Sequence, residues 1–403
     1  MRVLVAASTF PLHPDDGGPR FALDFCQALL RHVSVTVVAP AAPGSAARER
    51  WGDLEIRRFG YFLPRDRQCL AYGDGMAENL RRSPLALLQV PCFLAAEAHA
   101  LRALARELQS DVVHSHGILP QGLAAAWARG RERRFAHVTT LHGGDSYLLP
   151  WLPGSRALTE WICARSDAVL AVANNVRENL DRVLGRPSGA CVLPMGVDTA
   201  HFRSPAACRV EAPFPGGFLL FVGRFVAQKG LDVLLRALPR VRERHPGLGL
   251  VALGDGPLAS ELGRTARELG LDPWVRFAGR VDRTRVAAHL QACRVAIVPS
   301  IVDRRGQAEG LPSAALEALA AGARLVATDA GGVPDRVVHG RNGWLALAGD
   351  PTDLAAKVLL ALDSPLPPGV AESADALDWA RVAERHVAIY ERALAARSSA
   401  SPG

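Results

Sequence analysis

The stretch FVGRFVAQKGLDVLLRAL, residues 221 to 238, holds the end of an apolar strand, a loop with a glycine at each end and an amphipathic helix. A short apolar run that leads into a 3.6-residue period predicts a buried strand followed by a helix. The same succession recurs along the chain, which favours a parallel α/β fold. Strands are expected at residues 3–7, 33–39, 54–59, 111–115, 138–142, 168–172 and 190–193, then at 218–222, 248–253, 275–278, 295–298, 325–328 and 344–346. Helices are expected between many of them, for example at 20–30, 160–165 and 175–184.

The chain length of 403 residues exceeds what a single core usually organises, so two domains are expected. SPAACRVEAPFPGG, residues 204–217, has the Pro and Gly content of a linker, and SPLPPG, residues 364–369, precedes a last amphipathic helix. We therefore expect an N-terminal domain at 1–205, a second domain at 206–375 and a C-terminal helix at 376–403. Two doubly wound sheets that face each other would form a cleft lined by the carboxyl ends of both sheets, where such sheets bind ligands.

Composition argues against several classes of protein. The net charge of +7 has no basic tail or stripe, so no nucleic-acid partner is expected. The seven scattered cysteines indicate a reducing compartment and hence a cytoplasmic location. No apolar run reaches the roughly 18 residues that span a bilayer. The helical Ala/Leu-rich segment 76–108 favours a packed interior helix, with a peripheral contact at the inner membrane face as the open alternative.

Polar residues follow several strands of the first half. Gly17 and Gly18 follow the first strand, where their backbone N–H groups could approach a phosphate or a sugar, although a simple turn explains them equally well. TLHGGDSY, residues 140–147, offers His142 and Asp145 to a polyol, and HSHG, residues 114–117, offers His116 more weakly. The alternative for each histidine is a purely structural role.

Two cations stand in the loop of the opening stretch. Arg224 comes just after the strand and Lys229 just before the helix, a good arrangement for clamping a diphosphate. Solvated surface charges are the alternative, but Lys229 is one of only two lysines among 47 basic residues, which favours a function.

Two glutamates frame the helix start EGLPSAALEALAAG, residues 309–322. The free N–H groups and the dipole at a helix start favour an anion. A carboxylate there would repel phosphate, so Glu309 is expected to bind a neutral polyol instead. Glu317 lies on an otherwise apolar helix, needs a partner, and could reach a second diol such as a ribose. The stretch therefore predicts a nucleotide sugar, with the sugar at Glu309, the diphosphate at the helix start and the ribose at Glu317.

Six motifs occur together in this chain: Glu-x7-Glu (309–317), GR…KG (223–230), LGDGP (253–257), FAGRV (277–281), ATDAGGVPDRVVHGRNGWL (327–345) and HGGD (142–145). In combination they resemble family-4 retaining glycosyltransferases of the GT-B fold. The resemblance implies that the second domain holds a nucleotide-diphospho-sugar and the first holds the acceptor. The catalytic residues implied are Arg224, Lys229, Glu309 and His142. The donor contacts implied are Gly17, Gly18, Gly223, Arg280, Val281, Gly310, Leu311, Pro312 and Glu317. The acceptor contacts expected are Asp145, His116 and His13.

The resemblance also implies transfer with retention at the anomeric carbon. A UDP-sugar is the favoured donor, and the acceptor is a saccharide, a lipid-linked sugar or a small natural product. The sequence has no Asp-x-Asp pair, so no metal and no cofactor are expected. Three alternatives stay open: an inverting transferase with His13 as general base, a nucleotide-sugar epimerase of the same fold, and a non-catalytic sugar-nucleotide-binding protein.

Overall fold

A computed structural model describes residues 1–14, 16, 20–73, 75–130, 134–205, 208, 210–303 and 306–400. Gly17 and Gly18, two of the expected donor contacts, lie outside the described residues. The chain forms two compact units. Unit 1 comprises 1–172, 177–193 and 379–403, and unit 2 comprises 173–176 and 194–378.

Unit 1 is built, within its described residues, on an eight-stranded sheet with strand order β3-β4-β2-β1-β5-β6-β7-β8. β3 pairs with β4 in antiparallel fashion, and the other neighbours are parallel. The elements are β1 (Arg2–Ala7), α1 (Phe21–Leu29), β2 (Ser34–Pro40), β3 (Arg48–Trp51), β4 (Leu54–Phe59), η1 (Arg65–Arg67), α2 (Met76–Arg82), α3 (Pro84–Glu107), β5 (Val112–His116), η2 (Ile118–Gly122), α4 (Leu123–Arg129), β6 (Ala136–Leu141), α5 (Gly143–Leu148), η3 (Leu149–Trp151), α6 (Ser155–Cys163), β7 (Ala168–Ala171), α7 (Asn174–Leu184), β8 (Cys191–Val192) and α14 (Trp379–Ala400).

The described part of unit 2 contains a six-stranded parallel sheet with strand order β11-β10-β9-β12-β13-β14. Its elements are α8 (Thr199–Arg203), β9 (Phe218–Val222), η4 (Ala227–Lys229), α9 (Leu231–Arg244), β10 (Gly249–Leu253), α10 (Ala259–Glu268), η5 (Asp272–Trp274), β11 (Val275–Gly279), α11 (Arg283–Ala292), β12 (Val295–Val298), α12 (Ser313–Ala320), β13 (Leu325–Thr328), η6 (Val333–Asp335), β14 (Trp344–Ala346), α13 (Pro351–Asp363) and η7 (Glu372–Leu377).

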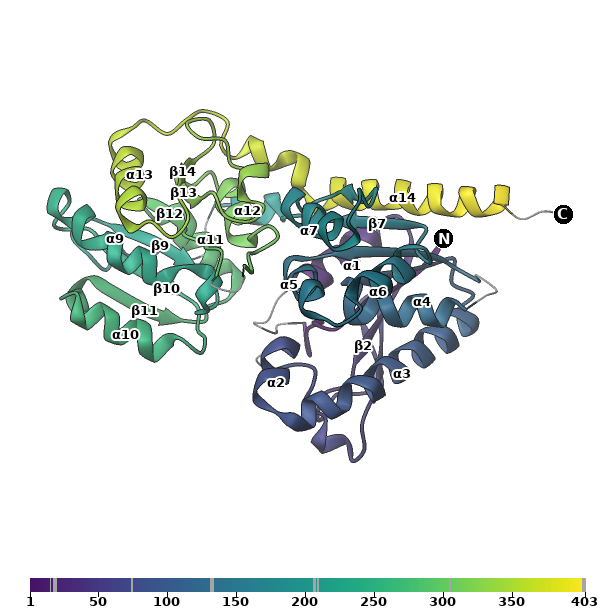
Figure 1. The fold of residues 1–403 in the computed structure, drawn as a ribbon. Coiled ribbons are helices and arrows are strands. Elements are labelled where there is room, and N and C mark those ends of the chain that lie inside the picture. Colours follow the sequence, from purple (N-terminus) through teal and green to yellow (C-terminus); the bar gives the residue numbers. More distant parts are fainter. Residues whose placement is uncertain are drawn as a thin grey trace. The chain divides into compact units, whose positions relative to one another are not determined.

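Each unit has helices on both faces of its sheet, the arrangement of a Rossmann-like domain (Figure 1). In unit 2, apolar residues of α9, α10 and α13 form one core on the sheet, and residues of α8, α11 and α12 form a second. In unit 1, α3 and α4 pack with β1 and β5 in one core, while α1 and α14 pack against each other. The central strands β5, β10 and β12 are buried at every residue, as the uninterrupted apolar runs of β10 and β12 predicted.

The structure confirms most predicted strands. Strands predicted at 54–59, 218–222, 295–298, 325–328 and 344–346 agree at both ends, and the others agree within two residues. Strand β3 was not predicted, because RERW at 48–51 carries three charged residues and alternates between exposed and half-buried positions at the edge of the sheet. The turn at Gly52, with φ +61°, and Asp53 is a hairpin signal that could have revealed it.

The division between the units comes earlier than the expected boundary after residue 205. Val197 and Phe202 belong to a core of unit 2, and the Val197 N–H donates to the Leu377 carbonyl at 2.8 Å. The first turn of α7 also belongs to unit 2 through Asn174, which donates its backbone and side-chain N–H groups to Asp335 at 2.7 and 2.9 Å. Such contacts between distant segments leave no mark in local composition, so the Pro-rich stretch 204–217 was mistaken for the boundary.

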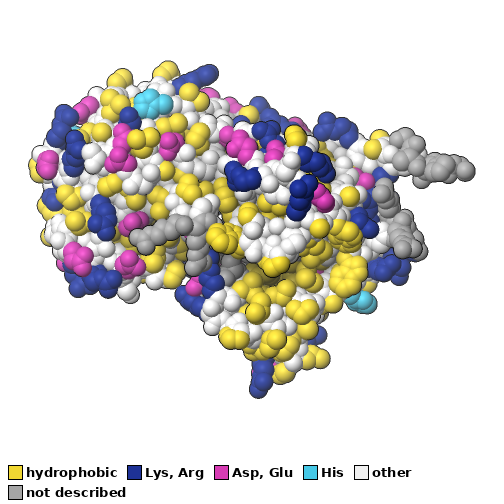
Figure 2. Space-filling view, viewed as in Figure 1, with side chains coloured by type: hydrophobic (Ala, Val, Ile, Leu, Met, Phe, Trp, Pro, Cys, Tyr) yellow, Lys and Arg dark blue, Asp and Glu magenta, His cyan; other side chains and the backbone are white. Residues whose placement is uncertain are grey.

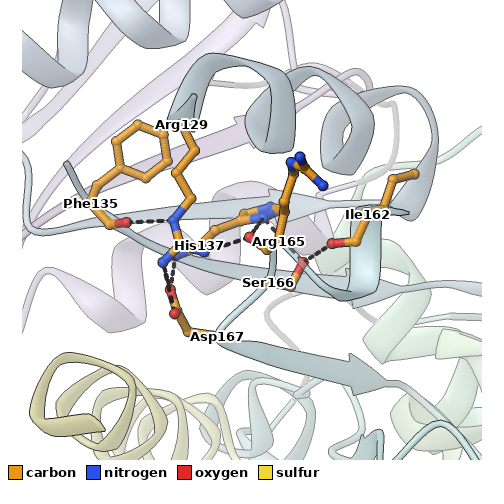
Figure 3. Close-up of polar contacts among 7 residues, drawn as sticks. All are labelled: Arg129, Phe135, His137, Ile162, Arg165, Ser166 and Asp167. Atoms are coloured by element: carbon orange, nitrogen blue, oxygen red, sulfur yellow. Dashed lines mark hydrogen bonds and ion pairs between the residues drawn. The ribbon is translucent and has the colours of Figure 1, made fainter. Parts of the chain in front are cut away.

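The amino-terminal ends of β6 and β7 are held together by a buried polar network (Figure 3). Arg129 donates to both carboxylate oxygens of Asp167, at 2.7 and 2.6 Å, and to the carbonyls of Phe135 and Arg165. The Asp167 carboxylate also accepts from the His137 backbone N–H at 2.8 Å. The side chains of Arg129 and Asp167 are 2% and 13% exposed, so this ion pair is shielded from water. The network therefore fixes the end of the sheet at which β6 and β7 begin.

Truncating one partner of this buried pair is expected to destabilise unit 1. Arg129→Ala leaves the Asp167 carboxylate without its cation, which costs about 3 kcal/mol of unfolding free energy. Arg156→Ala is the matched control, because the Arg156–Glu160 pair is 65% and 40% exposed and contributes at most about 0.5 kcal/mol. Urea denaturation followed by circular dichroism measures both. Equal losses in the two variants would contradict the assigned role of the network.

Candidate active site

Several of the predicted donor-side residues lie in the loops at the carboxyl ends of β9 and β12 in unit 2. β9 lies between β10 and β12: the chain continues from β9 to β10 and β11 on one side of it and then returns to β12 on its other side, so the strand order reverses between β9 and β12. Open α/β sheets bind ligands where strand order reverses in this way. The loop after β9 carries Gly223, Arg224 and Lys229, and the loop after β12 carries Glu309.

Lys229 and Glu309 form an ion pair with 2.5 Å between Lys229 Nζ and Glu309 Oε1. The second carboxylate oxygen of Glu309 accepts from the Ser300 hydroxyl at 3.0 Å. The side chains of Lys229 and Glu309 are 18% and 20% exposed, which leaves each partly open to a ligand. The structure thus brings together a cation predicted for the diphosphate and a carboxylate predicted for the sugar.

The two loops are joined by further hydrogen bonds. The Gln228 carbonyl accepts from the Ile301 N–H at 3.0 Å, and the Gln228 side-chain amide donates to Asp303 Oδ2 at 2.7 Å. Asn175 donates to the Glu309 carbonyl at 3.0 Å. These bonds fix the backbone on either side of the Lys229–Glu309 pair, so the pair is held by its supporting loops.

Two glycines hold the Glu309 loop from its other side. The Gly332 N–H donates to the Gly310 carbonyl at 2.5 Å. A β-carbon on Gly331 would lie 2.3 Å from the Glu309 carbonyl oxygen, and one on Gly332 would lie 2.1 Å from that of Gly310. Gly331 also has φ +63°, which favours glycine. Only glycine therefore lets the segment after β13 pack this closely on the backbone that presents Glu309.

The remaining donor predictions occupy different positions on unit 2. Gly223 lies beside the Lys229 stem, since a β-carbon there would be 3.4 Å from Lys229 Cδ. Arg224 is exposed on the same loop, and Arg280 is exposed just after β11. Glu317 is half-buried on the least buried side of α12. Three further predicted residues lie near these: Val281 and Leu311 pack on the core, and Pro312 is the N-cap residue of α12.

Sequence reasoning missed Ser300, Asn175, Gly331 and Gly332 as supports of Glu309. Ser300 ends the run RVAIVPS at residues 294–300, and Gly331–Gly332 follow the strand at 325–328. Both therefore stand at the carboxyl ends of predicted strands. That position is the signal that could have singled them out. Asn175 comes from the start of α7, and its contact with Glu309 spans 134 residues of chain.

In unit 1, His142 follows β6 and is the N-cap residue of α5. Asp145 accepts from the His142 backbone N–H at 2.9 Å and from the Ile118 N–H at 2.7 Å. Asp145 therefore fastens the His142 loop to the segment after β5, and burial raises the pKa of its carboxyl to about 7. His13, the third expected acceptor contact of this unit, is exposed in the loop after β1.

His116 lies buried against His142. Their rings are stacked, and 3.1 Å separates His116 Nδ1 from His142 Nε2. His116 is 5% exposed, and within the described residues its Nε2 has no hydrogen-bond partner. This burial fits a role in orienting His142 better than the direct acceptor contact that the sequence predicted.

The histidine stack continues into the C-terminal helix. The ring of His114 stacks on that of His116 at 4.5 Å, and its nitrogens lie 2.6 Å from the Tyr390 hydroxyl and 2.8 Å from that of Thr140. His386 of α14 and His114 both pack against Phe25. Burial lowers the pKa of His137, His142 and His386 to about 4, and that of His114 and His116 well below 6.5. His142 is therefore a neutral hydrogen-bonding group at pH 7.

These five histidines are expected to make unit 1 sensitive to acid. Between the unfolded pKa of about 6.5 and the lower folded values, the unfolded chain binds more protons, so stability falls as pH falls. The raised pKa values of Asp145, about 7, and Glu97, about 8, act in the opposite direction but involve two groups against five. The thermal midpoint measured from pH 7 down to about pH 5 should drop by several degrees. A constant or rising thermal midpoint would contradict the prediction that these five histidines are neutral in the folded protein.

Comparison with known proteins identifies the family. Residues 212–377 match the family described as "Glycosyl transferases group 1", and residues 16–201 match "Glycosyltransferase Family 4". The GDP-mannose-dependent alpha-(1-6)-phosphatidylinositol monomannoside mannosyltransferase of Mycobacterium tuberculosis is 31% identical over 289 residues, 69% of this chain and 73% of that protein. The chain belongs to the family-4 glycosyltransferases.

Two other glycosyltransferases show how much of a relative this chain matches and which fold it has. A glycogen synthase of Mycobacterium tuberculosis is 32% identical over 268 residues, 64% of this chain and 62% of that protein, so the match spans less than two thirds of that relative. The structure of sucrose-phosphate synthase from Thermosynechococcus elongatus superposes with a TM-score of 0.77 at 21% identity, covering 98% of this chain and 99% of that one. The two Rossmann-like units are thus those of the GT-B fold, which confirms the predicted fold class.

Proposed function

We propose that this protein is a retaining glycosyltransferase that moves a sugar from a nucleotide-diphospho-sugar to a hydroxyl of an acceptor. The observation that carries the proposal is the Lys229–Glu309–Ser300 arrangement where strand order reverses in unit 2. A cation and a carboxylate at that position suit the two ends of a sugar diphosphate, and family membership supports the reaction class.

In this mechanism unit 2 binds the donor. Lys229, Arg224 and the N–H groups at the start of α12 stabilise the charge that grows on the departing diphosphate. The bond between the anomeric carbon and the diphosphate oxygen breaks, and the acceptor oxygen bonds to that carbon from the same face. The acceptor proton passes to the leaving diphosphate, so atoms and charge balance without an added base. Glu309 accepts hydrogen bonds from the sugar hydroxyls, and Glu317 binds the ribose.

Unit 1 is proposed to bind the acceptor. The neutral His142 hydrogen-bonds a sugar hydroxyl, His116 orients its ring, and Asp145 holds its backbone. The acceptor classes proposed are a saccharide, a lipid-linked sugar and a small natural product. The seven cysteines are free thiols, which supports the proposed cytoplasmic location.

The test is acceptor-dependent release of a nucleoside diphosphate from a panel containing UDP-glucose and GDP-mannose. The panel includes GDP-mannose because the mannosyltransferase relative is named for it, whereas the sequence favours a UDP-sugar. Nuclear magnetic resonance of the product reports the anomeric configuration, and retention is expected. An isomerised donor would instead indicate an epimerase, and donor binding without turnover would indicate a binding protein.

Activity is expected to survive chelation. Within the described residues, no group of three or more His, Cys, Asp or Glu side chains is arranged to hold a metal ion. The proposed site supplies positive charge through Lys229 and Arg224, which is the electrostatic part that a divalent ion plays elsewhere. Transfer should continue at an unchanged rate in EDTA. Loss of activity in EDTA with rescue by Mg²⁺ or Mn²⁺ would contradict the metal-independent mechanism.

A further inference from the structure

The first half of helix α3 exposes several of its apolar residues. Leu87 and Leu88 are 63% and 69% exposed, and Leu85, Pro91 and Cys92 are also exposed. The side that faces the core instead includes Gln89 and Glu97, both fully buried. Exposed leucines in such a stripe are unusual on a soluble domain and mark a surface that meets an apolar partner.

The buried glutamine uses its hydrogen bonds to hold a basic loop against α3. Gln89 accepts from the Cys69 N–H at 3.0 Å and donates to the Arg67 carbonyl at 2.7 Å. The same loop exposes Leu63, at 80%, together with Arg65 and Arg67. The polar residue on the inner side of α3 thus ties to this helix the loop that exposes Leu63, Arg65 and Arg67.

We name the result the α3 surface and define it by Leu63, Leu85, Leu87, Leu88, Arg65, Arg67, Arg81 and Arg82. Figure 2 shows hydrophobic side chains gathered where Figure 1 places α2 and α3. Arg81 and Arg82 end α2 and both pair with Glu78. Against the four arginines, Asp66 and Glu78 are the carboxylates in the described parts of η1 and α2, so the surface carries an excess of positive charge.

We propose that the α3 surface docks this protein on a bilayer that contains anionic phospholipid. Leucines that enter the acyl boundary and arginines that meet lipid phosphates are the two attractions that hold peripheral proteins on membranes. A second copy of this chain is a poorer occupant, because a symmetric pairing would place four arginines against four arginines. The proposal concerns binding alone and stands independently of the proposed glycosyl transfer.

Docking on the bilayer fits the structure better than crossing it. Within the described residues, α3 is the one helix long and apolar enough to cross a membrane by length and composition, and 33% of its most apolar window is buried. Phe93 packs between Phe59 and Tyr61, with ring centroids 5.3 and 5.1 Å away. Gln89 is engaged as described above. The inner side of α3 is therefore committed to unit 1, and only the outer side is available to lipid.

The test is flotation of the full chain with vesicles made of equal parts phosphatidylglycerol and phosphatidylcholine, compared with phosphatidylcholine alone. We expect co-migration with the anionic vesicles at low salt and much less with the neutral ones. The double variant Leu87→Gln, Leu88→Gln keeps good helix formers and should lower partitioning about tenfold or more. Arg65→Gln, Arg67→Gln should lower it roughly tenfold or more as well.

Matched controls lie in unit 2. Leu360 and Leu366 are each 44% exposed, and their double glutamine variant controls for the loss of two surface leucines. Arg236 and Arg240, exposed on α9, control for the loss of two charges from a chain of net charge +7. Both control variants should float like the wild type.

Three results would overturn the proposal. They are no flotation of the wild type with anionic vesicles at low salt, equal flotation of the α3-surface variants and the wild type, and self-association in sedimentation that the leucine variant abolishes without any vesicle binding. Because flotation needs no sugar donor, failure here leaves the proposed glycosyl transfer untouched, and failure of transfer leaves this result interpretable.

Discussion

Replacing Lys229 by alanine is expected to lower kcat/KM for glycosyl transfer by about a thousandfold while the protein stays folded. The Lys229 ammonium lies at the carboxyl end of the central strand pair of unit 2, where a departing diphosphate would gain charge. It is 18% exposed, so its field is less screened by water than that of a surface lysine. Loss of this charge is therefore felt mainly in the transition state.

The second lysine of the chain provides the matched control. Lys357 lies on α13, and its Nζ is 3.6 Å from Asp353. Lys357→Ala removes the same charge from the same unit, away from the loops after β9 and β12, and should change kcat/KM by less than about twofold. If Lys229→Ala loses no more activity than Lys357→Ala, the phosphate clamp is wrongly assigned. Thermal unfolding of both variants checks that the fold persists.

The ion pair makes the effects of its two members interdependent. Lys229→Ala leaves the Glu309 carboxylate with the Ser300 hydroxyl as the described partner of its side chain. Glu309→Ala leaves Lys229 without that carboxylate and more available to phosphate. The double variant should therefore lose less than the product of the two single losses, because residues in contact are not additive.

Local patterns predicted the strands well because strands of a parallel sheet are buried on both faces. β9 and β12 appear as uninterrupted apolar runs, FLLFV and VAIV, between loop signals, and their limits were predicted to the residue. β3 has no such run, because it is a charged edge strand paired on one side. The sequence thus predicts apolar strands well, including the edge strand β14, and misses the charged edge strand β3.

The residues of the candidate site were singled out from the sequence one by one, but the contacts among them were not predicted. Lys229 and Glu309 were singled out separately, yet their contact depends on β9 and β12 being neighbours in the sheet, which local patterns do not determine. The histidine stack has the same origin, because Tyr390 reaches His114 across 276 residues through the return of α14 to unit 1. Long-range packing also buries His116 beside His142, which the sequence did not predict.

The two glutamates of the 309–322 stretch are expected to fail differently when each is replaced by alanine. Glu317→Ala should weaken binding of the free nucleoside diphosphate and of the intact donor by similar factors, since both contain the ribose. A lost hydrogen bond to a charged group is worth about 1.5–3 kcal/mol, or about ten- to a hundredfold in Kd. Calorimetry with the nucleoside diphosphate and with a slowly reacting donor measures both constants.

Glu309→Ala should leave the Kd of the nucleoside diphosphate within about twofold of the wild-type value and lower kcat by about a hundredfold or more. Its proposed contact is to the sugar, and that contact strengthens as the sugar ring gains positive charge. In this variant Lys229 no longer pairs with a carboxylate, which favours binding of a diphosphate. Loss of the negative charge of Glu309 would therefore not explain a weaker affinity for the diphosphate. Glu309→Gln keeps the side-chain volume against the loop held by Gly331 and Gly332, and Glu268→Gln on α10 controls for a surface glutamate. Equal loss of diphosphate affinity in the Glu309 and Glu317 variants, or no loss in either, would show that this stretch does not divide sugar from ribose.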